Sequence, residues 1–335
     1  MNTTSPAIES VERRPVLKIA LIITLALTAI TAESMFASRY LYHTASVQGA
    51  AYSALQPSPE PQPQLQPDLT MVAVGDMFFD RHIRQVGERE GGDFIFSCVE
   101  DLFRSADLVI GNLEGPVTAQ PSVSVGTPIG SPQNYQFTFP TTTAALLAKY
   151  NVQVVNLGNN HIGNFGIAGI ASTHTFLSTA GIGYFGGLDG NEPVFRTEMN
   201  GIKLSFVSYN QFGGSSPEKV AVTIAQEHLE GRVVIVYAHW GEEYSESLLG
   251  IREVAELFAE QGADAIIGSH PHIVLPHEYI GNTLVYYSLG NFIFDQYWNT
   301  EVNHGLALLL HLGGSSIIAD EYPVVLGSDG RTCPA

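Results

Sequence analysis

Short apolar runs recur along the chain after residue 68, and each run ends in polar residues. The runs are rich in Val and Ile and almost continuously apolar, which is typical of strands covered on both faces. We therefore predict strands in six segments: TMVAVGD (70–76), ADLVIGNLE (106–114), NVQVVNLGNNH (151–161), RVVIVYAHWGEEY (232–244), ADAIIGSHPH (263–272) and TLVYYSLGN (283–291).

Helix-like segments lie between several of these runs. Residues 141–150 begin with threonines that suit an N-cap, whereas 167–181 and 252–262 both end on glycine. The alternation of strand and helix predicts an α/β fold. In open α/β sheets ligands bind beyond the carboxyl ends of the strands, so we expect the polar residues at the run ends to form one site.

The N-terminal residues have a different pattern. A basic stretch precedes the apolar run IALIITLALTAITA, which is typical of a signal anchor or signal peptide. Ile30 stands where a cleavage site needs a small residue, which favours an uncleaved anchor. The predicted organisation is a cytoplasmic N-terminus (1–18), an anchor or signal peptide (19–32), an extended Pro/Gln-rich linker (33–68), a folded domain (69–327) and a polar tail (328–335). The domain would face outward from the cell membrane, or be secreted if the segment is cleaved.

Composition and charge narrow the possible partners. The 335 residues are 45 % hydrophobic and 14 % charged, which allows a large core. The formal net charge of −18 repels phosphate backbones, so nucleic-acid binding is not expected. The only two cysteines, Cys98 and Cys333, could pair in an exported protein, but free thiols fit the sequence equally well.

The residue types at the run ends favour metal chemistry. Carboxylates, imidazoles and side-chain amides together suit divalent Mn, Fe or Zn, and also Mg. A structural zinc site is not indicated, because no cysteine lies near these residues. Two ions bridged by a carboxylate would activate water and hold a phosphoryl group. We therefore expect a cofactor of one or two divalent ions.

Six motifs follow one another along the folded part of the chain: GDMFFDR (75–81), GNLEGPVT (111–118), NLGNNHIGNFG (156–166), AHWGEEY (238–244), GSHPHIVLPHEYIGN (268–282) and YSLGNFIFD (287–295). Together they resemble the CapA-like family of bacterial capsule-synthesis (poly-γ-glutamate-type, PGA_cap) proteins in the calcineurin-like metallophosphoesterase superfamily. The resemblance implies a four-layer α/β/β/α metallophosphatase-like sandwich in a single folded domain.

The same resemblance implies a role for each residue of the site. Glu114 would bridge two metals, whose other ligands would be Asp76, Asn160, His239, His270 and His272. His161 would stabilise or protonate the leaving oxygen, and Arg81 would hold an anionic group or form a structural salt bridge. Supporting positions around the ligands are expected at Asn112, Glu242, Ser288 and Asn291. His277 is expected away from the ligands, and the segment 121–136 as a surface insertion at the substrate entrance.

Three positions depart from the pattern of the superfamily or family. Phe78 stands where many metallophosphoesterases have a histidine two residues after the first aspartate, so a single ion or a weakly loaded site stays open. Asn164 replaces an aspartate that is common after the NNH motif. Asp80 replaces a small residue and is expected to neutralise part of the charge of Arg81.

Three functions remain compatible with these features. The first is an extracytoplasmic, metal-dependent protein of capsule or poly-γ-glutamate-type polymer synthesis or export, in which metal-activated water attacks a phosphoester or related bond. The second is a non-catalytic, membrane-anchored assembly factor, and the third is a secreted nucleotidase-like phosphatase. Expected partners are an anionic cell-surface polymer or its precursor, the membrane, and other capsule-synthesis membrane proteins. The sequence leaves open whether the chain is an enzyme.

Overall fold

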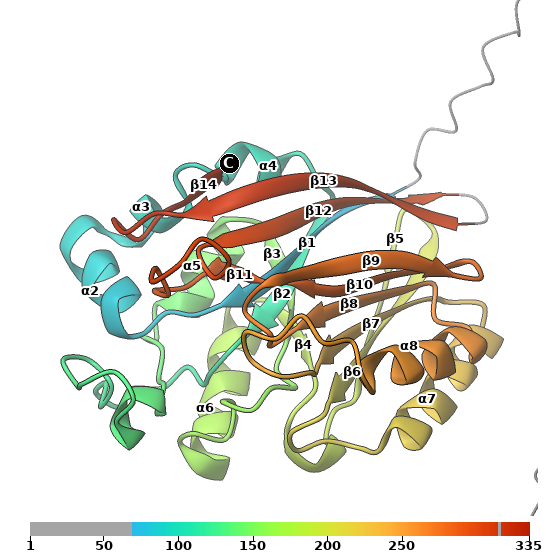
Figure 1. Cartoon of the computed structure of the whole chain (residues 1–335), viewed down its shortest axis with the longest axis horizontal. Coiled ribbons are helices and arrows are strands. Elements are labelled where there is room, and N and C mark those ends of the chain that lie inside the picture. Colours follow the sequence, from blue (N-terminus) through green and yellow to red (C-terminus); the bar gives the residue numbers. More distant parts are fainter. Residues whose placement is uncertain (1–68, 314–315) are drawn as a thin grey trace, which may run out of the picture. The chain divides into compact units, whose positions relative to one another are not determined.

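The structure, a computed structural model, describes residues 69–313 and 316–335. Within these ranges a pair of β-sheets packs face to face between layers of helices (Figure 1). The predicted four-layer α/β/β/α sandwich and the single folded domain are thereby confirmed. The cytoplasmic segment, the anchor and the linker predicted within 1–68 lie outside the described residues. Within the described ranges, every helix is too short or too polar to span a membrane.

The first sheet is mixed. Its strands are β1 (Leu69–Met77), β2 (Leu108–Leu113), β3 (Val152–Asn156), β4 (Gly183–Phe185), β11 (Asn291–Ile293), β12 (His304–Gly313), β13 (Ser316–Leu326) and β14 (Thr332–Pro334). The order is β14-β13-β12-β1-β2-β3-β4, and β11 pairs with the end of β1. Strands β1 to β4 are parallel, whereas β12, β13 and β14 pair antiparallel.

The second sheet has parallel strands in its centre and antiparallel strands at its edges. It contains β5 (Val194–Met199), β6 (Ile202–Asn210), β7 (Val233–His239), β8 (Ala265–Ser269), β9 (Val274–Ile280) and β10 (Thr283–Leu289), in the order β5-β6-β7-β8-β10-β9. Each of the six predicted runs contains a strand, namely β1, β2, β3, β7, β8 or β10.

Helices cover the outer face of each sheet. The first sheet packs against α2 (Arg81–Glu90), α3 (Gly92–Phe96), α4 (Glu100–Arg104), α5 (Thr143–Lys149) and α6 (Gly166–Thr179). The second packs against α7 (Pro217–Leu229) and α8 (Ile251–Glu260), and two short 3-10 helices, η1 (Pro132–Tyr135) and η2 (Leu188–Gly190), complete the set. Helices α5, α6 and α8 lie in the three segments predicted to be helical.

Alternate residues of the central strands fill different apolar layers. In β7, Ile235 and Tyr237 belong to the core between the sheets, whereas Val234 and Val236 pack with α7 and α8. This two-residue period explains why a strand buried on both faces has a continuous apolar sequence. The Tyr237 hydroxyl donates to the carbonyl of Ile110 at 3.2 Å, so the two sheets are also joined by a buried hydrogen bond.

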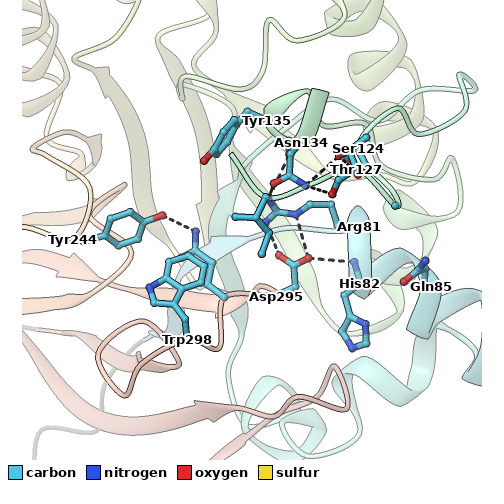
Figure 2. Close-up of a pocket in the computed structure, with 13 residues that line it drawn as sticks. Arg81, His82, Gln85, Ser124, Thr127, Asn134, Tyr135, Tyr244, Asp295 and Trp298 are labelled. Carbon is cyan, nitrogen blue, oxygen red and sulfur yellow. Dashed lines mark hydrogen bonds and ion pairs between the residues drawn. The ribbon is translucent and has the colours of Figure 1, made fainter. Parts of the chain in front are cut away.

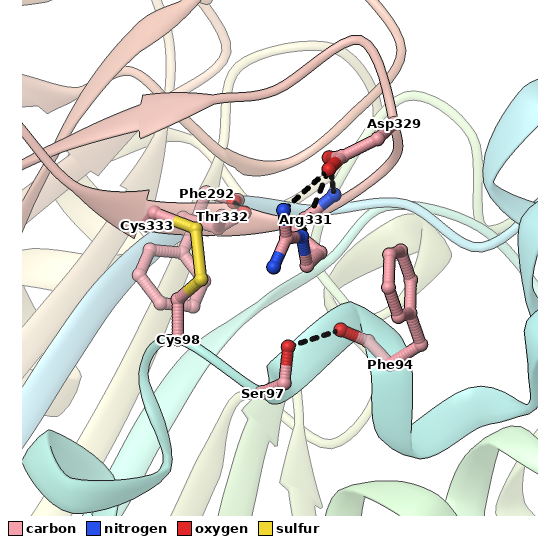
Figure 3. The surroundings of a disulfide bond; sticks show 8 residues. All are labelled: Phe94, Ser97, Cys98, Phe292, Asp329, Arg331, Thr332 and Cys333. Atoms are coloured by element: carbon pink, nitrogen blue, oxygen red, sulfur yellow. Dashed lines mark hydrogen bonds and ion pairs between the residues drawn. A yellow bond between two sulfur atoms is a disulfide. The ribbon is translucent and has the colours of Figure 1, made fainter.

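The C-terminal residues belong to the sandwich. The segment 328–335, expected to be a polar tail, contains β14, which pairs with β13. A disulfide joins Cys98, just after α3, to Cys333 in β14 (Figure 3). Of the two alternatives left open by the sequence, the structure therefore contains the paired cysteines. The folded domain continues beyond residue 327.

Candidate metal centre

Polar residues form two matching rows at the carboxyl ends of the parallel strands. The strand registers pair Asp76 with Asn112, Asn112 with Asn156, Asn210 with His239, and His239 with Ser269. The rows meet between the sheets, because the Asn112 side-chain nitrogen lies 3.4 Å from Nδ1 of His239. Register and sheet packing thus gather residues that are far apart in the sequence.

Two groups of buried ligand-type side chains share Glu114. One group contains Glu114, His239 and His270, and the other contains Asp76, Glu114 and His272. Within each group the potential ligand atoms all lie within 4.8 Å of one another. One carboxylate therefore stands between two positions that could each hold a cation.

The side chains present fit such cations. Both carboxylate oxygens of Glu114 and Nδ1 of His270 are buried and have no hydrogen-bond partner within the described residues. A buried carboxylate without a partner is strongly unfavourable unless it is neutralised. Burial raises the pKa of Glu114 well above its usual value, and the nearby Asp76 carboxylate raises it further. A divalent cation would supply the missing compensation.

The histidines are in the form that binds metals. Burial lowers the pKa of His239 well below its usual value, and burial lowers the pKa of His270 to about 3. Both imidazoles are therefore neutral at pH 7, as metal ligation requires. The donor set of carboxylate oxygens and imidazole nitrogens suits Mn, Fe or Zn. Neither cysteine contributes, because both are in the disulfide.

Asn160 and Ser269 fix the ring of His239 from two sides. The amide oxygen of Asn160 lies 2.9 Å from Nε2 of His239, and the Ser269 hydroxyl lies 3.0 Å from Nδ1. Asn160, predicted as a ligand, thus lies beside the group of Glu114, His239 and His270. Ser269 was not predicted, although its place at the end of β8, opposite His239 in the register, identifies it once the pairing is known.

Asn112 and Asn291, two of the predicted supporting positions, make hydrogen bonds with the second group. The side-chain nitrogen of Asn112 donates to Asp76 at 2.8 Å. The amide oxygen of Asn291 lies 2.9 Å from Nδ1 of His272, which leaves Nε2 of that ring 3.7 Å from Glu114. Bonds of this kind hold a ligand in place and set the tautomer of an imidazole.

Among the described residues, the other two predicted supporting residues form no hydrogen bond or ion pair with the candidate ligands. The buried Ser288 hydroxyl accepts the backbone N–H of Gly290 at 3.1 Å and stabilises the turn before β11. Glu242 is exposed and lines a surface pocket together with residues at the start of α8. His277 lies away from the site, as expected, because it is exposed on β9 and pairs with Glu321 at 3.1 Å.

The loop that carries His270 and His272 has an unusual backbone. Both residues have positive φ angles, of 96° and 58°, a region that costs a non-glycine residue about 1–3 kcal/mol. The backbone N–H of His270 donates to Asp76 at 3.1 Å, which helps to hold the loop. This conformation allows two rings from one tripeptide to serve the two different groups.

An aromatic cluster occupies the position of the missing histidine. Phe78 is fully buried, and its ring centroid lies 4.7 Å from that of Phe137 and 4.5 Å from that of Phe294. The group of Asp76, Glu114 and His272 therefore has three candidate donors and receives no ligand from residue 78.

His161 lies next to the two groups. Its Nε2 is 4.0 Å from Glu114, and its Nδ1 is 3.1 Å from the amide oxygen of Asn164. That oxygen also accepts the backbone N–H of Phe137 at 2.7 Å, which fixes the orientation of the amide. Burial lowers the pKa of His161 to about 4. Asn164 thus orients the ring without the charge of an aspartate.

Arg81 forms a salt bridge with Asp295. Its Nη2 lies 2.5 Å and its Nε 3.1 Å from the carboxylate oxygens of Asp295. Asp80, expected to neutralise Arg81, instead pairs through its side chain with Arg84 at 2.9 Å. That expectation was wrong because Arg81 begins α2, which turns its side chain toward Asp295 and places Arg84 one helical turn after Asp80.

Two further asparagines form the scaffold of the site and were not assigned from the sequence. Asn156 donates to the amide oxygen of Asn112 at 3.0 Å. Asn159 donates to the carbonyl of Leu113 at 2.9 Å and accepts the backbone N–H of His161 at 3.1 Å. The cluster of asparagines in NLGNN could have indicated this role from the sequence. Buried side-chain amides usually form hydrogen bonds with other polar groups.

A sequence model described as "Bacterial capsule synthesis protein PGA_cap" matches residues 70–296, which is more than half of the chain and includes every candidate ligand. The chain belongs to this family. The PGA_cap match confirms the resemblance drawn from the six motifs.

Two curated proteins illustrate the relationship of this PGA_cap chain to its relatives. It is 30 % identical to "PGA biosynthesis protein CapA" of Bacillus subtilis (strain 168) over 245 residues, which is 67 % of this chain and 63 % of that protein. It is 27 % identical to "Capsule biosynthesis protein CapA" of Bacillus anthracis over 278 residues, which is 76 % of this chain and 67 % of that protein. The chain thus spans less than two thirds of the Bacillus subtilis relative.

Proposed function

We propose that this PGA_cap chain is an extracytoplasmic, metal-dependent hydrolase of the metallophosphoesterase type. It would cleave a phosphoester or related bond in an anionic cell-surface polymer or its precursor, during capsule-type polymer synthesis or export. Glu114 supports this proposal most directly, because its buried carboxylate has no hydrogen-bond partner among the described residues and stands between two groups of ligand-type side chains.

The cofactor would be one or two divalent ions, with Mn, Fe or Zn favoured and Mg also compatible. When bound, the ions would supply Lewis acidity and make water more acidic at the reacting centre. Glu114 would hold both ions, with Asp76 and His272 on one side. The other side would be completed by His239, His270 and Asn160.

His161 would move the proton. Because its Nδ1–H donates to Asn164, the neutral ring presents an unprotonated Nε2 toward Glu114. This nitrogen can accept a proton within the site and then return it to the leaving oxygen. Burial and the contact with Phe137, 4.1 Å between ring centroids, keep the imidazole in place and limit its access to water.

Two features support a location outside the cytoplasm. Disulfides persist mainly in oxidising compartments, and the described cysteines form one. The basic and apolar pattern of the first 32 residues is that of a signal anchor or signal peptide. The membrane and other membrane proteins of capsule synthesis are the partners that such an anchor would bring close.

Activity of the full chain loaded with Mn, Fe or Zn provides the test. We expect turnover of at least one substrate among phosphomonoesters, phosphodiesters and γ-glutamyl peptides. His161→Ala should lower this turnover by about 10²–10⁴-fold while the metal content stays normal. His277→Ala, a change of an exposed histidine outside the site, is the matched control and should leave both unchanged. Full metal loading without turnover of any substrate would contradict the hydrolase.

Phe78 favours a second candidate, a non-catalytic assembly factor anchored to the membrane. The group of Asp76, Glu114 and His272 lacks the additional imidazole found in many metallophosphoesterases, which weakens the argument for two tightly held ions. In this case polymer export would depend on the chain, and His161→Ala would leave export unchanged.

A further inference from the structure

Figure 2 shows the residues that line a pocket of about 230 Å³. This pocket lies beside the candidate metal centre. Two contacts connect them. The ring centroid of Tyr244, which lines the pocket, is 5.9 Å from that of His272. Gln296, also in the lining, accepts a hydrogen bond at 3.0 Å from Asn291, the residue that holds His272. A substrate bound at the metal centre would therefore have its neighbouring unit within reach of the pocket.

The charges of the pocket cancel. Arg81 and Asp295 are the only Arg, Lys, Asp or Glu residues among the described residues that line it, and they pair with each other at 2.5 Å. The remaining guanidinium nitrogen of Arg81, Nη1, lies 3.3 Å from the side-chain oxygen of Asn134. An anion that entered the pocket would find no free cation among these lining residues, and burying an unpaired charge is costly.

Aromatic rings and uncharged polar groups make up the rest of the lining. Tyr135, Tyr244 and Trp298 lie on one side in Figure 2, with 48 %, 42 % and 56 % of their surfaces exposed. The segment 121–136 contributes Thr127 and Asn134 on the other side. Large aromatic side chains left exposed around a pocket commonly mark a binding site.

Several hydrogen-bonding groups of the lining are available. Among the described residues, no partner is found for the amide of Gln85, the hydroxyl of Tyr135 or the indole N–H of Trp298. All three groups are uncharged, and two belong to rings that also offer a flat apolar face. The pocket thus combines stacking surfaces with neutral donors and acceptors.

We propose that this pocket binds an uncharged, hydroxyl-bearing ring, a sugar unit, next to the anionic group that reaches the metal centre. The inference rests on the proposed function, because it names the neighbouring unit of that substrate. The C–H face of the ring would stack on Trp298 and Tyr244, and its hydroxyls would bond to the amides and hydroxyls. The pocket volume of about 230 Å³ is smaller than the roughly 300–1,000 Å³ of sites that bind drug-sized ligands, so it suits a single ring.

A γ-linked glutamate unit does not fit this description. It would bring an additional carboxylate into a pocket whose one guanidinium is already paired. The exposed Glu243 directly precedes Tyr244, which lines the pocket, and would repel that carboxylate further. The pocket therefore discriminates between a sugar-containing substrate and a stretch of polyglutamate.

Tryptophan fluorescence reports directly on this pocket. The chain has two tryptophans, and Trp240 is fully buried with its indole N–H bonded to Tyr287. Trp298 alone lines the pocket. Full-length protein treated with EDTA would be titrated with cellobiose, with N,N′-diacetylchitobiose and with γ-linked triglutamate. We expect a saturable change in emission with at least one disaccharide and no saturable change with triglutamate.

Two sets of variants complete the experiment. Tyr135→Ala and Asn134→Ala keep the fluorescent reporter and should each weaken disaccharide binding by about tenfold. The double variant His239→Ala/His270→Ala should lose metal but bind the disaccharide normally, so failure of the metal site and failure of the pocket are distinguished. Saturation by triglutamate but by neither disaccharide, or by no probe at all, would overturn the proposal.

Discussion

Glu114 and Glu227 are both buried carboxylates, but among the described residues only Glu227 has hydrogen-bond partners. Glu227, on α7, accepts hydrogen bonds from Arg196 at 2.8 Å and from Ser205 at 2.6 Å. A further cation is Arg232, whose Nε lies 3.6 Å from a carboxylate oxygen of Glu227. Glu114 has no hydrogen-bond partner for either oxygen among the described residues. The fold thus satisfies the carboxylate of Glu227 from its own residues, whereas the carboxylate of Glu114 has no such hydrogen bonds among the described residues.

The pKa values differ in the same sense. At Glu114 burial and the neighbouring Asp76 both raise the pKa of the carboxyl. At Glu227 burial also raises the pKa, but the hydrogen bonds from Arg196 and Ser205 outweigh burial and lower it overall. Burial alone therefore does not decide the state of a carboxylate. The availability of cations and donors decides it.

The largest effect should come from metal added to the metal-free chain. At a Mn²⁺ concentration 1,000 times the Kd, the free energy of unfolding should rise by about 4 kcal/mol, because only the folded chain presents the site. Glu114→Gln should remove most of this increase, since both groups lose their shared carboxylate. Urea unfolding with and without Mn²⁺ measures the difference. Glu227→Gln is the matched control and should retain the full increase; an equal increase in Glu114→Gln would contradict the comparison.

Glu227→Ala should have the next largest effect. We expect a loss of about 2–3 kcal/mol in the free energy of unfolding, below the ~3–5 kcal/mol of a fully buried pair, because Arg196 is 48 % exposed and can be hydrated. Urea unfolding at pH 7 provides the measurement. Arg104→Ala breaks an exposed pair with Glu100 and should change stability by less than ~0.5 kcal/mol. Equal effects of the two variants would show that burial of the pair is irrelevant.

The smallest effect concerns pH. Since the pKa of Glu227 is lower in the folded chain than its ordinary value of 4.5, its stabilising contribution is present above pH 4.5 and is lost as the pH falls through the lowered value. The difference in stability between wild type and Glu227→Gln should therefore shrink between pH 5 and pH 3. Unfolding by urea across this range measures it. A difference that grows on acidification would have the wrong sign.

The sequence predicted six strands inside the two sheets, but it missed the interior strands β6, β12 and β13 as well as the edge strands. Continuous apolar runs identified β1, β2, β3, β7, β8 and β10, because strands buried on both faces have no polar face to interrupt them. The edge strands β5 and β9 are partly exposed and carry mixed residues, so they lacked this signal. Strand order and the pairing of β12 with β1 depend on contacts between distant segments, which periodicity does not contain.

The candidate site was likewise only partly predictable from the sequence. Asp76, Glu114 and His239 each stand at or directly after the end of an apolar run, which marked them as candidate site residues, and the resemblance then implied their roles as ligands. The partner of Arg81 could not be named, since Asp295 is 214 residues away and meets it only in the folded chain. Ser288 was predicted near the ligands because it is a polar residue at the end of a run. Its hydroxyl instead accepts the backbone N–H of Gly290 and stabilises a local turn. Residue type indicated the chemistry, and tertiary packing selected the partners.

The disulfide has a consequence for resistance to proteolysis. It closes a loop from Cys98 to Cys333 that includes every candidate ligand except Asp76. The segment 121–136 lies inside this loop and exposes Ile129, which makes it a natural target for proteases in the proposed location outside the cell. A single cut there would leave the two fragments covalently joined, with β1 still paired to β2. The nicked chain would keep its candidate ligands together.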